Sequence, residues 1–268
     1  MSEAITTTPT VRWKSVALPA EHGGWGFLIE PMLLGMLVAP SWAGLWICLS
    51  ALGVFLIHQP LRTALKDRLR GRRFTRTAYA ERFAAAYGVF GLGSFVLALL
   101  TAQAPFWIPL LFAVPLAGVQ LLYESRNRGR ELVPEVSGAL ALGATAPAIV
   151  LAAGCSPTLA ALSWIVITLR VVPSILYVRT RLSVLHGRPI SHRTSLIAHV
   201  MALIIGGVIW ANGLVTWTAL LALVLLLVRA VVGLRQTNVP ARTVGFQEMG
   251  SGLLYAVLGA IGTVRAIC

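Results

Sequence analysis

The chain has 268 residues, of which 57% are hydrophobic and 12% charged, and its mean hydropathy is +0.81. A soluble globular domain carries roughly 25% charged residues, so this composition excludes a soluble domain and makes the lipid bilayer the expected solvent. The net charge of +13 comes from 22 Lys and Arg residues against 9 Asp and Glu residues. Because Asp67 is the one aspartate in the sequence, chemistry that needs paired aspartates is disfavoured.

The chain begins with a polar, Thr-rich segment, residues 1–20, which lacks the apolar core of a signal peptide and is expected to stay in the cytoplasm. Residues 21–268 are predicted to form a single transmembrane domain. A spanning helix needs about 20 apolar residues, and the apolar runs predict an all-α protein with nine such helices. They are expected at about 24–39, 43–61, 83–101, 105–123, 134–153, 158–178, 195–211, 215–233 and 247–264.

The distribution of cations predicts the orientation, because Lys and Arg near membrane ends are retained on the cytoplasmic side. Nineteen of the 22 cations lie in the amino-terminal tail or after the second, fourth, sixth and eighth helices, whereas the turns near Pro40, Gln103, Cys155 and Asn212 carry no charge. The amino terminus is therefore predicted inside and the carboxyl terminus outside, in a bacterial cytoplasmic (inner) membrane. On the outer side, Cys155 and Cys268 could form a disulfide.

The basic loops recur about every 55 residues, which indicates a repeated helical hairpin and predicts a ring of hairpins around a shared centre. Polar residues within the apolar runs concentrate in the cytoplasmic half. This pattern predicts a pocket that is open to the cytoplasm and closed on the outer side.

Glu30 and Arg170 are ionisable residues inside apolar runs, and each lies nine residues from a charged residue nearer the inner surface, Glu21 and Arg179 respectively. At 1.5 Å per residue both are roughly 13 Å deep. Buried ionisable groups normally face the bundle interior and have a partner, so Glu30 and Arg170 are expected to pair. The pair could be functional, or it could only hold the helices in register. Pro31 and Pro173 follow closely and are expected to break the helices locally.

Further polar residues are expected to point inward from the cytoplasmic half. These are His58, Gln59, Glu135, Tyr177, His199 and Arg229. Arg229 could instead extend its guanidinium to the surface, and His199 could be an ordinary hydrogen-bonded helix residue.

Glu21 and His22 form the one adjacent pair of acid and imidazole, and a carboxylate can orient an imidazole for proton transfer. Glu21, His22 and Glu30 are therefore the catalytic candidates. Glu21 could instead only stabilise a helix amino terminus. The histidines and cysteines have no metal-ligand spacing, so no metal and no cofactor are expected. The RGRR segment lies beside the membrane, so no nucleic-acid partner is expected.

Two stretches, AEHGGWGFLIEP and HQPLRTALKDRLRGRR, resemble the YwiC-like family of bacterial membrane proteins, and the resemblance extends over nearly the whole chain. The family name implies no activity. The predicted topology also resembles, more distantly, the UbiA superfamily of intramembrane prenyltransferases. That resemblance implies a UbiA-like helical bundle in which Mg²⁺ and two Asp-rich motifs hold an isoprenoid diphosphate.

The superfamily's metal-binding motifs are absent from this chain. Its first motif, Asn-Asp-x-x-Asp-x-x-x-Asp, aligns His58 with Asn and Gln59, Arg62 and Lys66 with the acids. At the second motif, Tyr177 and Arg181 stand in place of two aspartates. Because Mg²⁺ prefers carboxylate ligands, the resemblance implies the fold without its metal chemistry.

Arginine forks bind phosphate oxygens directly, so cations at these positions suggest a metal-free site for an anionic headgroup. The expected binding residues are His58, Gln59, Arg62, Lys66, Arg126, Arg128, Arg170, Tyr177, Arg179 and Arg181. The same cations could instead only contact anionic membrane lipid.

These patterns predict a protein that binds an amphiphilic anionic lipid, isoprenoid or quinone-like, in a cytoplasm-facing pocket. It could be a divergent, metal-independent prenyltransferase-like protein, and whether it is an enzyme is left open. The alternative is a non-enzymatic transporter of a small anion or a lipid-binding accessory protein. Membrane lipids are the expected partners.

Overall fold

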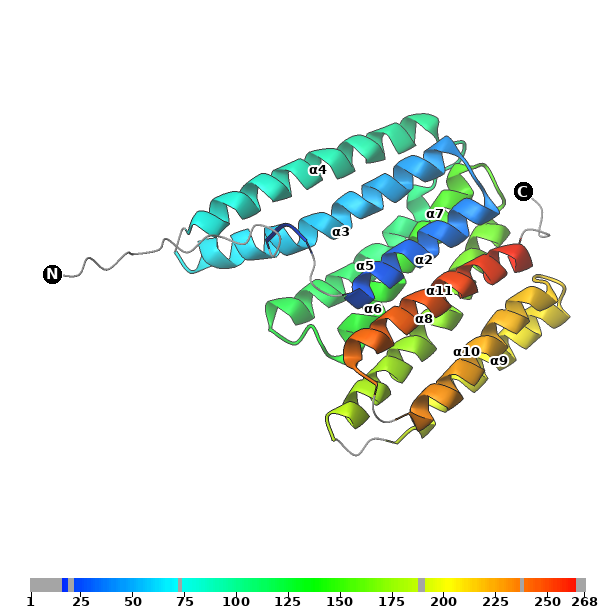
Figure 1. The fold of residues 1–268 in the computed structure, drawn as a ribbon. Coiled ribbons are helices and arrows are strands. Elements are labelled where there is room, and N and C mark those ends of the chain that lie inside the picture. Colours follow the sequence, from blue (N-terminus) through cyan, green and yellow to red (C-terminus); the bar gives the residue numbers. More distant parts are fainter. Residues whose placement is uncertain (1–15, 19–21, 72–73, 188–190, 237–238, 264–268) are drawn as a thin grey trace.

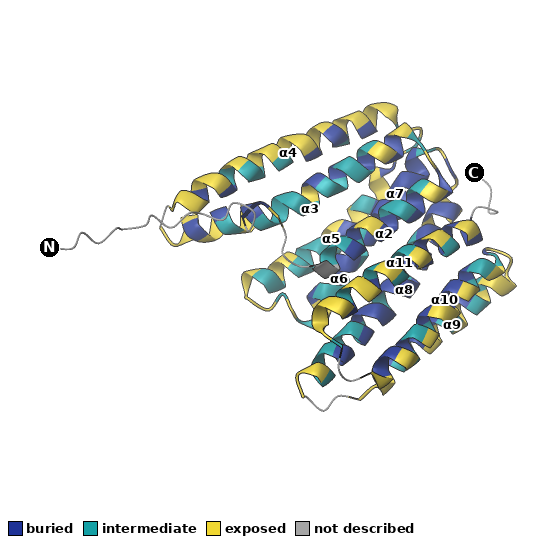
Figure 2. Ribbon diagram, in the orientation of Figure 1, coloured by how far each residue is buried: buried dark blue, intermediate teal, exposed yellow. Residues whose placement is uncertain are grey.

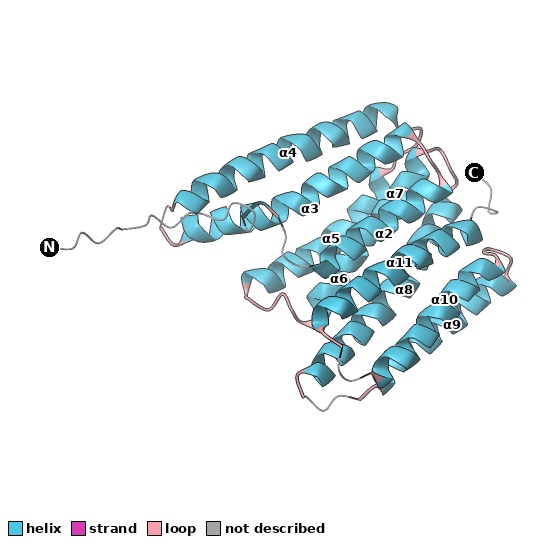
Figure 3. Ribbon diagram, in the orientation of Figure 1, coloured by secondary structure: helices cyan, strands magenta, loops and turns pink. Residues whose placement is uncertain are grey.

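The computed structural model describes residues 16–18, 22–71, 74–187, 191–236 and 239–263, which form helices and turns and no strand. Short loops join the helices (Figure 3). In chain order they are α2 His22–Val38, α3 Trp42–Leu69, α4 Thr75–Thr101, α5 Trp107–Ser125, α6 Leu132–Gly143, α7 Thr145–Ala152, α8 Pro157–Leu185, α9 Arg193–Ala211, α10 Trp217–Arg235 and α11 Ala241–Thr263.

Eight helices of the described part are long and apolar enough to cross a membrane, with α6 and α7 together counting as one. The predicted first crossing, α2, is shorter, since its apolar part runs only from Gly24 to Val38. The chain is therefore an integral membrane protein with several apolar helices. Cys268 lies outside the described residues, so its predicted pairing with Cys155 stays a prediction.

Helices α3, α4, α8 and α11 are clearly longer than the sequence predicts, because they continue past the apolar run at the end that carries the basic loops, here called the basic end. Helices α3, α4 and α8 have 28, 27 and 29 residues. At 1.5 Å per residue each is roughly 40 Å long, whereas the hydrocarbon core is about 30 Å thick. Helix α3 ends at Leu69, and Gly71, which follows shortly after it, has a φ of +63° that suits glycine.

The helix break that the sequence predicts at Pro31 and Pro173 is not found, since α2 and α8 both continue through these prolines. The break lies instead between α6 and α7, within the predicted helix 134–153. Pro147 lies in the first turn of α7, where the missing amide N–H of proline leaves no intrahelical hydrogen bond unmade.

The helices form three groups (Figure 1). Helices α3 and α4 make a hairpin on one side, in which a Cβ on Gly53 would lie 2.6 Å from the Cα of Gly91. Helices α9 and α10 pair on the opposite side, and α2, α5, α6, α7, α8 and α11 lie between. Buried residues concentrate on α7 and α8, whereas α4 is mostly exposed and would face lipid (Figure 2).

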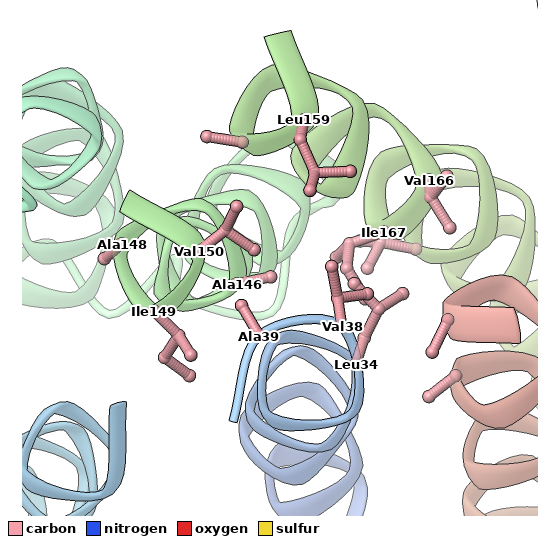
Figure 4. Packing of buried hydrophobic residues seen from close by; sticks show 14 of the residues in the cluster. Leu34, Val38, Ala39, Ala146, Ala148, Ile149, Val150, Leu159, Val166 and Ile167 are labelled. Carbon is pink, nitrogen blue, oxygen red and sulfur yellow. The ribbon is translucent and has the colours of Figure 1, made fainter. Parts of the chain in front are cut away.

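At the end opposite the basic loops, here called the outer end, apolar side chains fill the centre. Leu34 of α2, Ile149 of α7 and Ile167 of α8 are at most 1% exposed and converge in one cluster (Figure 4). Interiors packed in this way leave little room for water. The polar residues described next lie nearer the basic end.

Candidate functional site

The centre of the site is a buried ion pair between α2 and α8. Arg170 Nη2 donates a hydrogen bond to Glu30 Oε1 at 2.9 Å and another to the backbone oxygen of Glu248 at 2.9 Å. The side chains of Glu30 and Arg170 are each 2% exposed. The predicted pairing of these two residues is confirmed.

A second ion pair, between α10 and α11, adjoins the first. Arg229 Nη1 donates to Glu248 Oε1, and Arg229 Nη2 donates to Ser174 Oγ at 3.3 Å. Glu248 Oε2 lies 3.9 Å from Arg170 Nη2, which links the two pairs. The alternative in which Arg229 extends to the surface is therefore wrong, because its guanidinium binds Glu248 inside the bundle.

Aromatic side chains extend this cluster toward α9. The Arg229 guanidinium lies 4.2 Å from the centre of the Tyr177 ring, within the range of a cation–π contact. The ring of Tyr177 is in turn edge-on to the ring of His199, with centres 6.4 Å apart. His199 Nδ1 lies 2.8 Å from the backbone oxygen of Ser195, as an ordinary hydrogen-bonded helix histidine would.

We call these residues the charged cluster: Glu30, Arg170, Ser174, Tyr177, Ser195, His199, Arg229 and Glu248. Its two arginines are matched by two glutamates, so the cluster is neutral when all four are ionised. An ionised group inside a membrane costs at least a few kcal/mol without a partner, and this matching explains how four such groups can share one interior. The sequence predicts an open pocket in this part of the bundle, but in the structure the side chains of the charged cluster occupy that space.

A shallow groove of about 290 Å³ lies between α2 and α11, near the basic end. It is lined by Trp25, Ile29, Gly245, Phe246 and Met249. Its lining is almost wholly apolar. Ile29 and Met249 are the chain neighbours of Glu30 and Glu248, so the groove and the charged cluster lie on different faces of the same two helices.

Most of the predicted headgroup cations lie at the surface and none of them lines this groove. Arg62, Lys66 and Arg126 are exposed. Arg128 is also exposed and binds Glu131, with Nη2 to Oε2 at 2.9 Å. Hydrogen bonding from Arg128 holds the pKa of Glu131 below its usual range.

The two predicted cations of α8 have protein partners. Arg179 Nη1 donates to Glu135 Oε2 at 2.7 Å and to the backbone oxygen of Arg130 at 2.9 Å. Arg181 is buried and donates to the backbone oxygen of Gln236 at 2.9 Å. Both guanidiniums therefore hold the basic ends of helices together.

The two sets of residues at the superfamily motif positions lie on different sides of the bundle. His58 Nε2 of α3 is 2.8 Å from Glu124 Oε2 of α5, and Gln59 on the same helix is half-buried. Tyr177 of α8 instead packs against Ala230 of α10, on the far side from α3 (Figure 1).

The remaining sequence candidates give little support for a metal site or a catalytic pair. Glu21 and the side chain of His22 lie outside the described residues, so their pairing stays a prediction. Asp67 is buried between α3 and α4, where it accepts hydrogen bonds from Arg76 and Thr77. Within the described ranges no three His, Cys, Asp or Glu side chains gather in a way that could hold a metal ion.

A family model for YwiC-like proteins matches residues 18–150. The chain belongs to the YwiC-like family. Neither a curated protein nor a solved structure matches it. In this YwiC-like chain the matched range contains Glu30, α2 to α6 and most of α7, whereas Arg170, Arg229 and Glu248 lie beyond it.

Proposed function

We propose that this YwiC-like chain binds an amphiphilic lipid with an isoprenoid or quinone-like tail and an anionic head, and that the groove between α2 and α11 receives the tail. The observation that carries the proposal is the groove itself: about 290 Å³, apolar, and open near the basic end. Small-molecule sites are mostly apolar clefts of about 300–1,000 Å³, so the groove suits part of a lipid tail.

The cation nearest to this groove in the sequence is Arg242 of α11. Its guanidinium lies 5.5 Å from the ring centre of Phe246, which lines the groove. Arginine binds phosphate and carboxylate oxygens through paired N–H groups. A phosphate, diphosphate or carboxylate head at Arg242 would leave the tail beside Phe246.

The proposed role is binding, and we assign no group-transfer step. The five residues that line the groove include no acid and no base, and the carboxylates of Glu30 and Glu248 are engaged in the charged cluster. Transport of a small anion has less support, because the two buried arginines are already matched by these glutamates.

The proposal includes the orientation that the cations predict. The amino terminus and the basic loops lie in the cytoplasm of a bacterial inner membrane, and α2 makes a ninth crossing in a UbiA-like bundle. The resemblance to the UbiA superfamily, whose members bind isoprenoid chains, supports an isoprenoid tail.

The test is native mass spectrometry of the full chain, purified in mild detergent, with lipid extraction and identification in parallel. A Cβ on Gly245 would meet no atom within 4 Å, and the same is true of Gly250 on the same helix. Gly245 lines the groove and Gly250 does not. Gly245→Leu should therefore fill the groove, and Gly250→Leu serves as the matched control.

We expect the unaltered protein and Gly250→Leu to retain an isoprenoid or quinone-like lipid, and Gly245→Leu to lose most of it. Retention of bulk phospholipid alone would overturn the proposal. Equal retention of the isoprenoid lipid in Gly245→Leu would show that the groove is not the site.

A further inference from the structure

A polar stripe runs along the buried face of α8 from the basic end to the middle of the bundle. Arg170, Ser174, Tyr177 and Arg181 are four, three and four residues apart, which places them on one helix face, and all four are buried. At 1.5 Å per residue the stripe is roughly 16 Å long. We call it the α8 lane.

Side chains from α9, α10 and α11 complete the α8 lane. Arg229 contacts Ser174 and the ring of Tyr177, and it binds Glu248. His199 lies edge-on to Tyr177. Polar groups therefore follow one another from Arg181 near the basic end to Glu30 in the middle of the bundle.

Several polar atoms of the charged cluster have no hydrogen-bond partner in the described part of the chain, although they are buried. They are Glu30 Oε2, Arg170 Nε and Nη1, Ser195 Oγ, His199 Nε2, Arg229 Nε and Glu248 Oε2. A buried polar atom without a partner costs about 1–3 kcal/mol, and more when it is charged. Seven such atoms in one cluster indicate a site that takes up water or protons.

The α8 lane stops at Glu30, because the same face of α8 is apolar farther toward the outer end. Val166 and Ile167 are at most 3% exposed there and pack with Leu34. Ser163 is also on this face, but its hydroxyl already donates to the backbone oxygen of Ala160 at 2.7 Å. Polar groups on this face of α8 therefore continue toward the basic end only.

We propose that Glu30 is a proton-binding site that is reached through the α8 lane from the basic end and is closed toward the outer end. A hydronium ion entering the lane gives its proton to Glu30 Oε2, so that an O–H bond of hydronium breaks, an O–H bond on Glu30 forms and a water molecule remains. Arg170 Nη2 then loses its charged partner on Glu30 and turns to Glu248 Oε2, 3.9 Å away.

Charged or titratable groups reach Glu30 from α8 and α11, two of the helices packed against α2. Helix α8 contributes Arg170, and α11 contributes Glu248 and Tyr255, whose hydroxyl donates to the backbone oxygen of Val166. Arg229 of α10 reaches the cluster through Glu248. Helix α7 has no titratable side chain.

The acidic residues and the histidine of α3 and α6 are engaged elsewhere. His58 of α3 pairs with Glu124, and Asp67 of α3 binds Arg76. Glu135 of α6 pairs with Arg179. The proton at Glu30 is therefore controlled by the charged cluster. This inference does not depend on the lipid proposal.

The experiment is infrared difference spectroscopy of the full chain in lipid nanodiscs during a pH titration. Protonation of Glu30 should produce the carbonyl stretching band of a neutral carboxylic acid as the pH falls. Protein labelled with ¹³C-glutamate and carrying Glu30→Asp identifies the band, because position 30 and Asp67 keep ¹²C frequencies while every remaining glutamate shifts. The same labelled protein without Glu30→Asp gives the band of Asp67, which is subtracted. Because aspartate keeps the negative charge at position 30, Arg170 keeps an anionic partner and the variant is expected to fold.

The path is tested by the rate at which the band shifts after transfer to D₂O. Ser174→Ala removes a hydroxyl from the α8 lane, and Ser163→Ala removes one from the same face of α8 beyond Glu30. We expect several-fold slower exchange in Ser174→Ala and an unchanged rate in Ser163→Ala. Absence of any ¹²C band beyond that of Asp67, at every pH at which the protein stays folded, would overturn the proton site. Equal rates in both variants, or slowing in Ser163→Ala alone, would overturn the path. Retention of a lipid has no bearing on either result.

Discussion

Gly252 lies where the side chains of α2 and α8 meet α11. A Cβ at this position would overlap Glu30 Oε1 and lie 2.5 Å from Arg170 Nη2. The absence of a side chain at Gly252 is therefore what lets the buried ion pair form against α11. A residue far from either charge in the sequence thus decides whether the charged cluster can assemble.

We predict that Gly252→Ala displaces Glu30 from Arg170 and lowers the thermal unfolding midpoint in detergent. Breaking a buried ion pair costs about 3–5 kcal/mol, which sets the upper range of the effect. Gly250→Ala is the control, since a Cβ there meets no atom within 4 Å. That control should be neutral or mildly stabilising, because alanine favours helix by about 1 kcal/mol over glycine. Equal midpoints for the two variants would contradict the assigned role of Gly252.

Part of the charged cluster could be predicted from the sequence. Glu30 and Arg170 stand out because each is an ionisable residue deep in an apolar run. Glu248 was missed, because hydropathy places the start of its helix at about 247, whereas α11 begins at Ala241 and buries Glu248 two turns later. The available signal was charge balance, since two buried arginines require two acids.

At the scale of elements, the α3–α4 hairpin extends past the apolar run and is held there by polar contacts. Asp67 accepts bonds from Arg76 Nη2 at 2.7 Å and Thr77 Oγ1 at 2.8 Å, and its side chain is 2% exposed. Arg68 binds Glu81 at the surface. Hydropathy cannot locate the ends of such helices, because the final turns are helical and polar at once.

We predict that Asp67→Ala loosens the basic end of the hairpin by about 1–3 kcal/mol, since it leaves Thr77 without its buried acceptor. Hydrogen–deuterium exchange should become faster around Leu69 and Thr75 and stay unchanged near Gly53. Arg68→Gln, which breaks the exposed pair with Glu81, should cost at most about 1 kcal/mol. Similar exchange in the two variants would show that Asp67 does not hold the hairpin.

At the scale of the whole molecule, the loops that carry cations and the uncharged turns lie at opposite ends of the bundle (Figure 1). The connections after α3, α5, α8 and α10 are basic when the helix turns beside them are included, whereas the turns after α2, α4, α7 and α9 carry no charge. Positive charge is retained in the cytoplasm, so the composition of the loops alone predicts the orientation. It does not predict whether the short helix α2 spans the membrane.

Two reporter fusions test separately the orientation of the protein and whether α2 crosses the membrane. We predict that green fluorescent protein at the amino terminus is fluorescent, and that alkaline phosphatase at the carboxyl terminus is active, because the first requires the cytoplasm and the second the outside. An inactive phosphatase would contradict the orientation. An active phosphatase with a dark amino-terminal fusion would show that α2 does not cross.

Helix α2 presents Ile29 to the groove and Glu30 to Arg170 on successive residues. A rotation or tilt of this one helix therefore alters both surfaces at once. If a ligand in the groove and a proton on Glu30 favour different positions of α2, each changes the affinity for the other by the same factor, as thermodynamic linkage requires. The neighbouring positions of these two residues would make α2 the coupling element of the molecule.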